Sequence, residues 1–322
     1  MSNTKTRREM LVRSMAVVGA ASLVTGAPSR QTPAAAHAFV DGFSPTVRYC
    51  LNTSTIRGQE IPLDGEIDLA AAAGYDSVEP WIREIRKFME DGGKLADLRK
   101  RLDDHGLSVD SAIGFATWIV DDDQQRSQGL EVLKSDMELL QQLGGTRIAA
   151  PPAGATEQSD LDLGQAAERY AAALRVGEQM GVHPQLELWG FSKTLSRLGE
   201  LMYVAIESGH KDASVLLDVY HIYKGGSDFE GLRLIDGSAV QVLHMNDYPD
   251  IPRSRISDAD RVYPGEGVAP LTRILQTLFE NGFSGVLSLE LFNRQYWREA
   301  AASVLEKGLA AMKNAVETAT HV

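Results

Sequence analysis

The strongest constraint on this chain is a repeated unit, in which a short β-rich run is followed by a helical pattern. Eight β-rich runs occur, at residues 47–54, 75–80, 107–115, 146–152, 183–189, 214–221, 241–247 and 285–292. Segments between them place apolar residues three or four positions apart and end in glycine, as at 95–106, 128–145 and 166–181. Strands that alternate with helices in this way predict an all-parallel sheet covered by helices.

Two architectures contain such a sheet, a closed (β/α)8 barrel and an open doubly wound sheet. A doubly wound sheet that binds a dinucleotide carries G-x-G-x-x-G after its first strand. The corresponding turn here reads "NTSTIRGQEIP" (52–62) and lacks that motif. We therefore expect a (β/α)8 TIM barrel, formed as a single catalytic domain by residues 39–322.

The first 38 residues have the pattern of a twin-arginine export signal. Arg7 and Arg8 precede an apolar run from Met15 to Ala27, and residues 36–38 form an A-x-A cleavage site. The apolar run is too short and too rich in alanine and glycine for a membrane span. We expect a periplasmic or secreted protein whose mature chain begins near Phe39. The alternative is a basic N-terminus that arose by chance.

The net charge of the chain disfavours one class of binding partner, and its cysteine content excludes an internal disulfide. Residues 1–38 carry five basic residues and one acidic residue, so their removal changes the formal net charge from −12 to −16. A surface this negative repels phosphate backbones and disfavours nucleic acid as a partner. The only cysteine, Cys50, excludes an internal disulfide and is expected to be a small buried residue. The sequence leaves monomer and homo-oligomer open.

Polar residues end or interrupt the last four β-rich runs. They are Glu187 in "LELWG", Asp218 in "LLDVYH", His244 in "LHMND" and Glu290 in "SLELF". In a barrel the C-terminal ends of all strands open on one mouth, so these four side chains are expected to converge there. Three carboxylates at close range repel one another unless a cation lies between them. Oxygen-rich ligands with one imidazole suit Mn²⁺, and also Mg²⁺ or Co²⁺.

Each of these residues also has a simpler interpretation. A glutamate at a strand end commonly forms a salt bridge or caps a helix, and a single histidine in a strand is commonly hydrogen-bonded in place. The metal interpretation depends on four such residues at the corresponding place in four successive units.

The set "LELWG … LLDVYHIYKGG … VLHMNDYP … DRVYPGEGV … LSLELF" resembles the sugar isomerase/epimerase superfamily with the xylose isomerase-like TIM barrel. This superfamily includes D-tagatose 3-epimerase, D-psicose epimerase, and inosose dehydratase and isomerase. The resemblance covers essentially all of residues 39–322 and is densest from Glu187 onward. It implies that Glu187, Asp218, His244 and Glu290 are metal ligands, and that Glu187 and Glu290 are the catalytic acid–base pair.

The resemblance also implies substrate contacts. His221, in the D-x-x-H spacing after Asp218, corresponds to a substrate-binding histidine, and Arg261, ahead of "PGEG" (264–267), to a substrate-binding arginine. The segment "NDYPDIPRSRISDAD" (246–260) is a departure from the simple epimerases, because it lengthens the distance from His244 to Arg261. Arg253 or Arg255 therefore stays an alternative to Arg261.

Other polar and aromatic residues have two interpretations each. Lys224 in "YKGG" is either a ligand for a substrate oxygen or a solvated loop residue. Glu79 in "SVEPW" either supports the site or pairs with an arginine. The aromatic residues Trp118, Trp189 and Phe292 form either an apolar wall against a sugar ring or part of the core.

These features predict a metal-dependent carbohydrate isomerase or epimerase that acts on a free sugar, keto-sugar or cyclitol through an enediolate. A dehydratase or lyase acting on a keto-inositol or 3-keto-glycoside is the alternative enzyme. A third hypothesis is an exported sugar-binding protein or partner subunit without turnover. An AP endonuclease is disfavoured because only His221 and His244, of seven histidines, follow strands suitably for a multi-metal site.

Overall fold

Eight parallel strands form the centre of the protein, as the alternation in the sequence predicts. The computed structural model describes residues 45–321, and the expected signal peptide lies outside the described residues. The strands are β1 (Arg48–Asn52), β2 (Ser77–Glu79), β3 (Ser108–Val109), β4 (Arg147–Ala150), β5 (His183–Glu187), β6 (Val215–Asp218), β7 (Val240–Met245) and β8 (Val286–Leu289). They pair in the order β3-β2-β1-β8-β7-β6-β5-β4.

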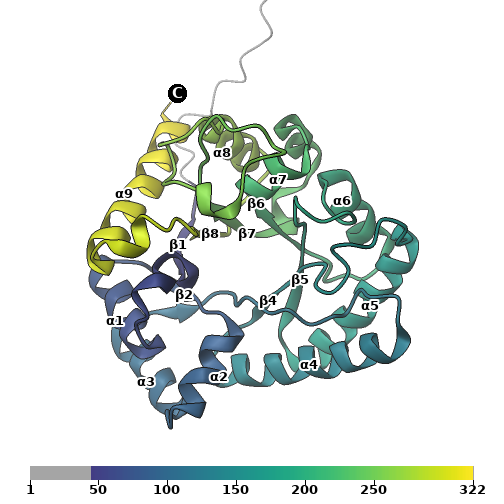
Figure 1. Cartoon of the computed structure of the whole chain (residues 1–322), viewed down its shortest axis with the longest axis horizontal. Coiled ribbons are helices and arrows are strands. Elements are labelled where there is room, and N and C mark those ends of the chain that lie inside the picture. The colour runs from purple at the N-terminus through teal and green to yellow at the C-terminus, as the bar shows by residue number, and fades with distance from the viewer. Residues whose placement is uncertain (1–44, 322) are drawn as a thin grey trace, which may run out of the picture. The chain divides into compact units, whose positions relative to one another are not determined.

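The two ends of this order, β3 and β4, approach each other and bring the sheet back on itself. The N–H of Ala149 donates to the carbonyl of Ala112, just beyond β3, at 2.9 Å. Beside this bond the Gln185 amide donates to the Ser111 hydroxyl at 3.1 Å. The helices form a ring around the strands (Figure 1). The expected TIM barrel is therefore confirmed, and the join between β3 and β4 has the fewest backbone hydrogen bonds.

All eight strands are shorter than the predicted runs, and side-chain hydrogen bonds account for the early ends of β3 and β6. The third run was expected to extend over 107–115, but Asp110 accepts hydrogen bonds from Arg48 at 2.7 Å and from the Ser108 hydroxyl at 2.8 Å. Side-chain bonds of this kind compete with a strand ladder. The sixth run was expected to extend to residue 221, but its strand ends at Asp218. There the carboxylate accepts the N–H of His221 at 2.8 Å and starts a short helix.

The helices are α1 (Leu63–Ala73), α2 (Ile82–Glu90), α3 (Leu95–His105), α4 (Asp123–Gln142), α5 (Leu163–Met180), α6 (Leu198–Glu207), α7 (Val219–Gly225), α8 (Leu271–Glu280) and α9 (Ala301–Thr320). Asp122 caps α4 by accepting the N–H of Gln125. Gly106 and Gly181 end α3 and α5 with φ of 68° and 63°, a conformation that favours glycine. Within residues 45–321, no helix combines the length and apolar character that crossing a bilayer requires.

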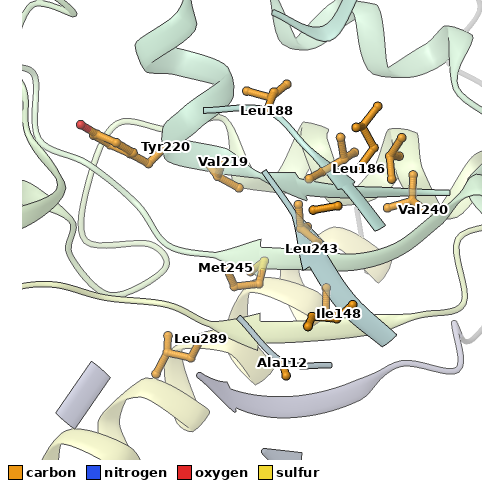
Figure 2. Close-up of a cluster of buried hydrophobic side chains, with 14 of the residues drawn as sticks. Ala112, Ile148, Leu186, Leu188, Val219, Tyr220, Val240, Leu243, Met245 and Leu289 are labelled. Carbon is orange, nitrogen blue, oxygen red and sulfur yellow. The ribbon is translucent and has the colours of Figure 1, made fainter. Parts of the chain in front are cut away.

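The hydrophobic core has an outer and an inner part. The outer part lies between strands and helices and includes Leu186, Leu243 and Leu289, drawn in Figure 2. The inner part fills the barrel and consists of Cys50, Trp81, Ile113, Ala149, Leu216, Val242 and Val286. Cys50 is buried and unpaired within the described chain, as expected. Each strand therefore presents one set of side chains to the helices and the alternate set to the barrel interior.

One carboxyl is buried on the helical side of this barrel. Glu66, on α1, is only 3% exposed. Burial, and then the nearby carboxylate of Glu84, raise the pKa of Glu66 to about 9, although Arg57 opposes the shift. Glu66 is therefore protonated in the folded protein at neutral pH, whereas an unfolded chain ionises it near its ordinary pKa of 4.5.

This difference makes stability depend on pH. The folded state holds a proton that the unfolded state releases, so the contribution of Glu66 is fully present below pH 4.5 and is lost as the pH rises toward about 9. We expect Glu66→Gln, which cannot ionise, to match the wild type near pH 4 and to exceed its unfolding free energy by at least about 1 kcal/mol at pH 8. Urea unfolding at several pH values measures this difference. The exposed Glu306→Gln is the control, and a Glu66→Gln curve parallel to wild type at every pH would contradict the explanation.

Candidate metal centre

The alternation of side chains along the strands positions the candidate site. On β6, Leu216 lies in the inner core and Leu217 in the outer core, so Asp218 returns to the inner face. On β7, Val242 lies in the inner core, and His244, two residues later, lies on the same face. The polar groups therefore lie directly above the apolar floor of the barrel, at the C-terminal strand ends.

Three of the four predicted ligands approach one another closely. The Nδ1 atom of His244 lies 3.2 Å from Oε2 of Glu290 and 3.4 Å from Oδ2 of Asp218. One ligand atom from each of these residues lies within 4.8 Å of the other two, and all three side chains are buried. Two carboxylates and an imidazole thus face a common point.

Glu79 orients the imidazole of His244. Its Oε2 atom lies 3.0 Å from Nε2 of His244 and accepts hydrogen bonds from the Ser288 hydroxyl and the Asn52 amide at 2.7 and 2.9 Å. Nδ1 of His244 is left buried without a hydrogen-bond partner among the described residues. Burial lowers the pKa of His244, but Glu290 and Glu79 outweigh it and raise that pKa well above its ordinary value. A histidine held through one nitrogen, with the other facing carboxylates, has the arrangement of a metal ligand.

Glu187 is the fourth predicted ligand, and it lies outside the close cluster of Asp218, His244 and Glu290. It is 3% exposed, and it lines the same cavity as Glu290. Burial is the main cause that raises the pKa of Glu187 to about 8; His244 opposes the shift, and the carboxylates of Glu290 and Asp218 add to it. In the described chain it is not among the three residues whose ligand atoms lie within 4.8 Å of one another.

Arg261 supplies positive charge to the same carboxylates. Its guanidinium is fully buried, and Nη1 donates to Oδ2 of Asp218 at 2.8 Å and to Oε2 of Glu290 at 2.7 Å. Nη2 donates to Asp258 at 2.6 Å. The structure thus places Arg261 in the site, whereas the alternatives Arg253 and Arg255 are exposed.

His221 lines the cavity beside Arg261. Its Nε2 atom lies 3.3 Å from Nη2 of Arg261, and its Nδ1 accepts the N–H of Gly190 at 3.3 Å. Burial is the main cause that lowers the pKa of His221, since the attraction of Asp218 only partly compensates. A neutral imidazole at this place can hydrogen-bond a substrate hydroxyl.

Lys224 does not line the cavity. Its ammonium donates to the backbone carbonyls of Arg253 and Ile256, at 2.8 Å each. The neighbouring Tyr223 hydroxyl donates to the carbonyl of Ile251, also at 2.8 Å. Lys224 was predicted to bind a substrate oxygen. In the structure its side chain instead links helix α7 to the loop that carries Arg261.

The cavity above the site has a volume of about 250 Å³. Its polar walls are Glu187, His221, Asp258, Arg261 and Glu290, and its apolar walls are Trp81, Ile113, Phe115, Trp189, Phe191 and Phe292. Larger hollows of about 530 and 940 Å³ lie among the outer helices, away from the strand ends. The small cavity therefore combines convergent polar groups with an apolar wall, as substrate pockets commonly do.

The aromatic prediction is partly corrected by this cavity. Trp189 and Phe292 line it, but Trp118 is fully buried, packs on Tyr170 at a ring distance of 5.7 Å and donates to the carbonyl of Pro151. Trp118 therefore belongs to the core. Sequence reasoning missed Trp81, which follows a β-rich run, and Phe115, which ends one. It also missed Asp258, for which the inserted segment gives no signal.

Curated relatives of the chain include isomerases, dehydratases and an epimerase. An inosose isomerase of Bacillus velezensis is 27% identical over 266 residues, which cover 81% of this chain and 94% of the relative. A 3-dehydroshikimate dehydratase of Pseudomonas aeruginosa is 26% identical over 241 residues, which cover 72% of this chain and 36% of that longer protein.

Solved structures agree on the fold. The crystal structure of the IOLI protein with a bound zinc atom has a TM-score of 0.80 at 23% identity, over 86% of this chain and 100% of the other. The family model described as xylose isomerase-like TIM barrel matches residues 67–315. That span exceeds half of the sequence and contains all four predicted ligands, so the chain belongs to the xylose isomerase-like TIM barrel family.

Proposed function

We propose that this protein is a divalent-metal-dependent isomerase or epimerase of a free sugar, keto-sugar or cyclitol. The observation that carries the proposal is the buried Nδ1 of His244, which has no hydrogen-bond partner among residues 45–321 and faces Asp218 and Glu290. Glu290 also lines the small cavity. The inosose isomerase relatives support a cyclic polyol or its ketone as substrate.

The residues that would hold the cation are Glu187, Asp218, His244 and Glu290. This donor set of three carboxylates and one imidazole suits Mn²⁺ best, with Mg²⁺ or Co²⁺ as alternatives. The zinc atom in the related IOLI structure adds zinc to the ions worth testing. When bound, a divalent cation supplies Lewis-acid polarisation of a substrate carbonyl.

The protein itself supplies proton transfer and orientation. Glu187 and Glu290 both line the cavity, so either carboxylate is placed to take a proton from a bound substrate or to return one. If one glutamate removes the proton beside the carbonyl and the other returns it to the opposite face, the centre is inverted. If the proton returns to the neighbouring carbon, aldose and ketose interconvert. His221 and Arg261 orient the substrate oxygens in both cases.

A dehydratase is the second candidate, favoured by the 3-dehydroshikimate dehydratase relatives. The same abstraction beside a carbonyl expels a hydroxyl when one lies β to the developing negative charge. Proton NMR in D₂O distinguishes the two reactions, since an epimerase gives a solvent-exchanged isomer and a dehydratase an unsaturated product. Tight sugar binding without any exchange would instead support a binding protein.

Metal binding can be tested separately from turnover. We expect Mn²⁺ at a hundred times its dissociation constant to stabilise the protein by about 2.7 kcal/mol, visible as a rise in Tm. His244→Gln should remove this rise. The matched control is His210→Gln, because His210, Glu178 and Asp212 form a second, partly exposed cluster whose acids are already paired with Lys211. Equal Tm rises in both variants, or no rise with any of the four metals, would contradict the metal site.

Proton transfer is tested by exchange. In a panel of free sugars, keto-sugars and cyclitols in D₂O with Mn²⁺, we expect one class to incorporate deuterium beside its carbonyl. Glu290→Gln should slow that incorporation by about 10²- to 10⁴-fold, the usual contribution of a general acid or base. The exposed Glu280→Gln should leave the rate unchanged. If Glu290→Gln incorporated deuterium at the wild-type rate, Glu290 would not be the acid or base of the reaction.

We also propose export by the twin-arginine route, on the evidence of Arg7, Arg8 and the A-x-A site at 36–38. A reporter fused to residues 1–38 should reach the periplasm, and replacing both arginines by lysine should retain it inside the cell. Cell fractionation measures the distribution. Equal export of both fusions would contradict this route.

A further inference from the structure

Three aromatic side chains form a continuous surface in the wall of the cavity. Phe115 lies after β3, and Trp189 and Phe191 lie after β5. The ring centroid of Trp189 is 5.8 Å from that of Phe115 and 5.3 Å from that of Phe191. All three residues line the cavity. We call this surface the aromatic rim.

The aromatic rim is connected at both ends to the polar part of the cavity. At one end, Phe115 packs on Trp81 at a ring distance of 5.1 Å, and Trp81 lines the cavity together with Glu290. At the other end, Phe191 packs on His221 at a ring distance of 5.8 Å, and His221 also lines the cavity. A ligand that contacts Glu290 and His221 therefore has the aromatic rim as its next neighbour.

Solvent exposure shows that the aromatic rim lies at the mouth of the cavity. Glu290 is 4% exposed and Trp81 is 8% exposed, whereas Phe115 is 40% and Phe191 is 48% exposed. A first ring held by the buried acids can pack its apolar face on Trp81 or Phe292, which both line the cavity. The exposed faces of the rim lie beyond that ring, with open space beside them for a second group.

The exposure of these rings calls for an explanation. Single exposed apolar side chains are common, but a contiguous apolar patch bordered by polar groups marks a binding site. Among residues 45–321, the other exposed aromatic side chain is Tyr203, which lies on helix α6 beside one of the outer hollows. Phe115 and Phe191 thus concentrate exposed aromatic surface at the entrance to the polar cavity.

We propose that the aromatic rim is a second subsite, which binds an uncharged ring joined to the reacting sugar or cyclitol. The rim takes a flat apolar face, which an aryl group and the C–H side of a second sugar ring both present. The charged residues that line the cavity are three acids and one base, Glu187, Asp258, Glu290 and Arg261, so an anionic ring is disfavoured. The inference rests on the proposed function in taking this cavity as the substrate pocket.

Matched ligands test the subsite. With the full-length protein and Mn²⁺, calorimetry compares D-glucose with cellobiose, myo-inositol with galactinol, and methyl with phenyl β-D-glucoside. We expect the two-ring member of a pair to bind about 10-fold more tightly than its one-ring partner. Phe115→Ala and Phe191→Ala should each reduce this preference. The matched control is Tyr203→Ala, which removes an aromatic ring of similar exposure from helix α6 and should retain the preference.

Further variants separate stacking from apolar bulk. Phe115→Leu keeps the bulk and loses the flat ring, whereas Phe115→Trp keeps a ring. A preference that is lost in Phe115→Leu and kept in Phe115→Trp, at unchanged Tm, supports stacking. A preference that Phe115→Leu retains in full would overturn the ring assignment. Tighter binding of 4-carboxyphenyl than of phenyl β-D-glucoside would overturn the assignment of an uncharged ring.

The remaining outcomes decide the subsite itself. Equal binding of one-ring and two-ring probes, no binding of any two-ring probe, or a preference retained by both alanine variants would overturn it. A larger preference for the phenyl probe assigns the rim to an aryl group, and a larger one for cellobiose or galactinol assigns it to a second sugar ring. If two-ring probes bind through the rim but no sugar or cyclitol exchanges deuterium, the proposed reaction fails while the subsite stands.

Discussion

The structure depends on balancing buried negative charge at the C-terminal ends of the strands. Glu79, Asp218 and Glu290 are at most 4% exposed, and burying one ionised carboxylate without a partner is costly. His244 and Arg261 both contact Oδ2 of Asp218 and Oε2 of Glu290. A metal cation bound here would share the oxygens of Asp218 and Glu290 with His244 and Arg261, or displace them. Partial neutralisation of this kind offsets part of the cost of burying these carboxylates while keeping their oxygens close together.

The same charges connect the site to a distant part of the chain. Arg261 follows the long segment after β7, and that segment is fixed by Lys224 and Tyr223 of α7. Helix α7 itself begins at Asp218. The loop, the short helix and the buried carboxylates therefore form one hydrogen-bonded unit, and a displacement of the loop moves the guanidinium relative to both acids.

The barrel and the four strand-end residues could be predicted because they follow from periodicity, which is local in sequence. Leu216 and Asp218 are two residues apart, and this spacing alone places both on the inner face. The role of Lys224 could not be predicted, since it depends on the path of a loop about thirty residues away. Trp118 and Phe115 are equally apolar and three positions apart, and only packing decides which of them reaches the cavity. The residues at which β3 and β6 end could not be predicted, because they are set by side-chain hydrogen bonds and not by the spacing of apolar residues.

Asp218 and Glu187 illustrate how identical chemistry acquires different roles. Oδ1 of Asp218 accepts the first N–H bond of α7, and Oδ2 accepts from Arg261 and Asn246. Both oxygens are therefore held, and chiefly the charge of Arg261 holds the pKa of Asp218 well below its ordinary value despite burial. Glu187 borders the cavity, and burial raises its pKa toward neutrality. A carboxylate anchored by both oxygens suits a fixed ligand, whereas one with a raised pKa beside open space suits proton transfer. The environment of each acid, rather than its type, thus shifts the two pKa values in opposite directions within one charge cluster.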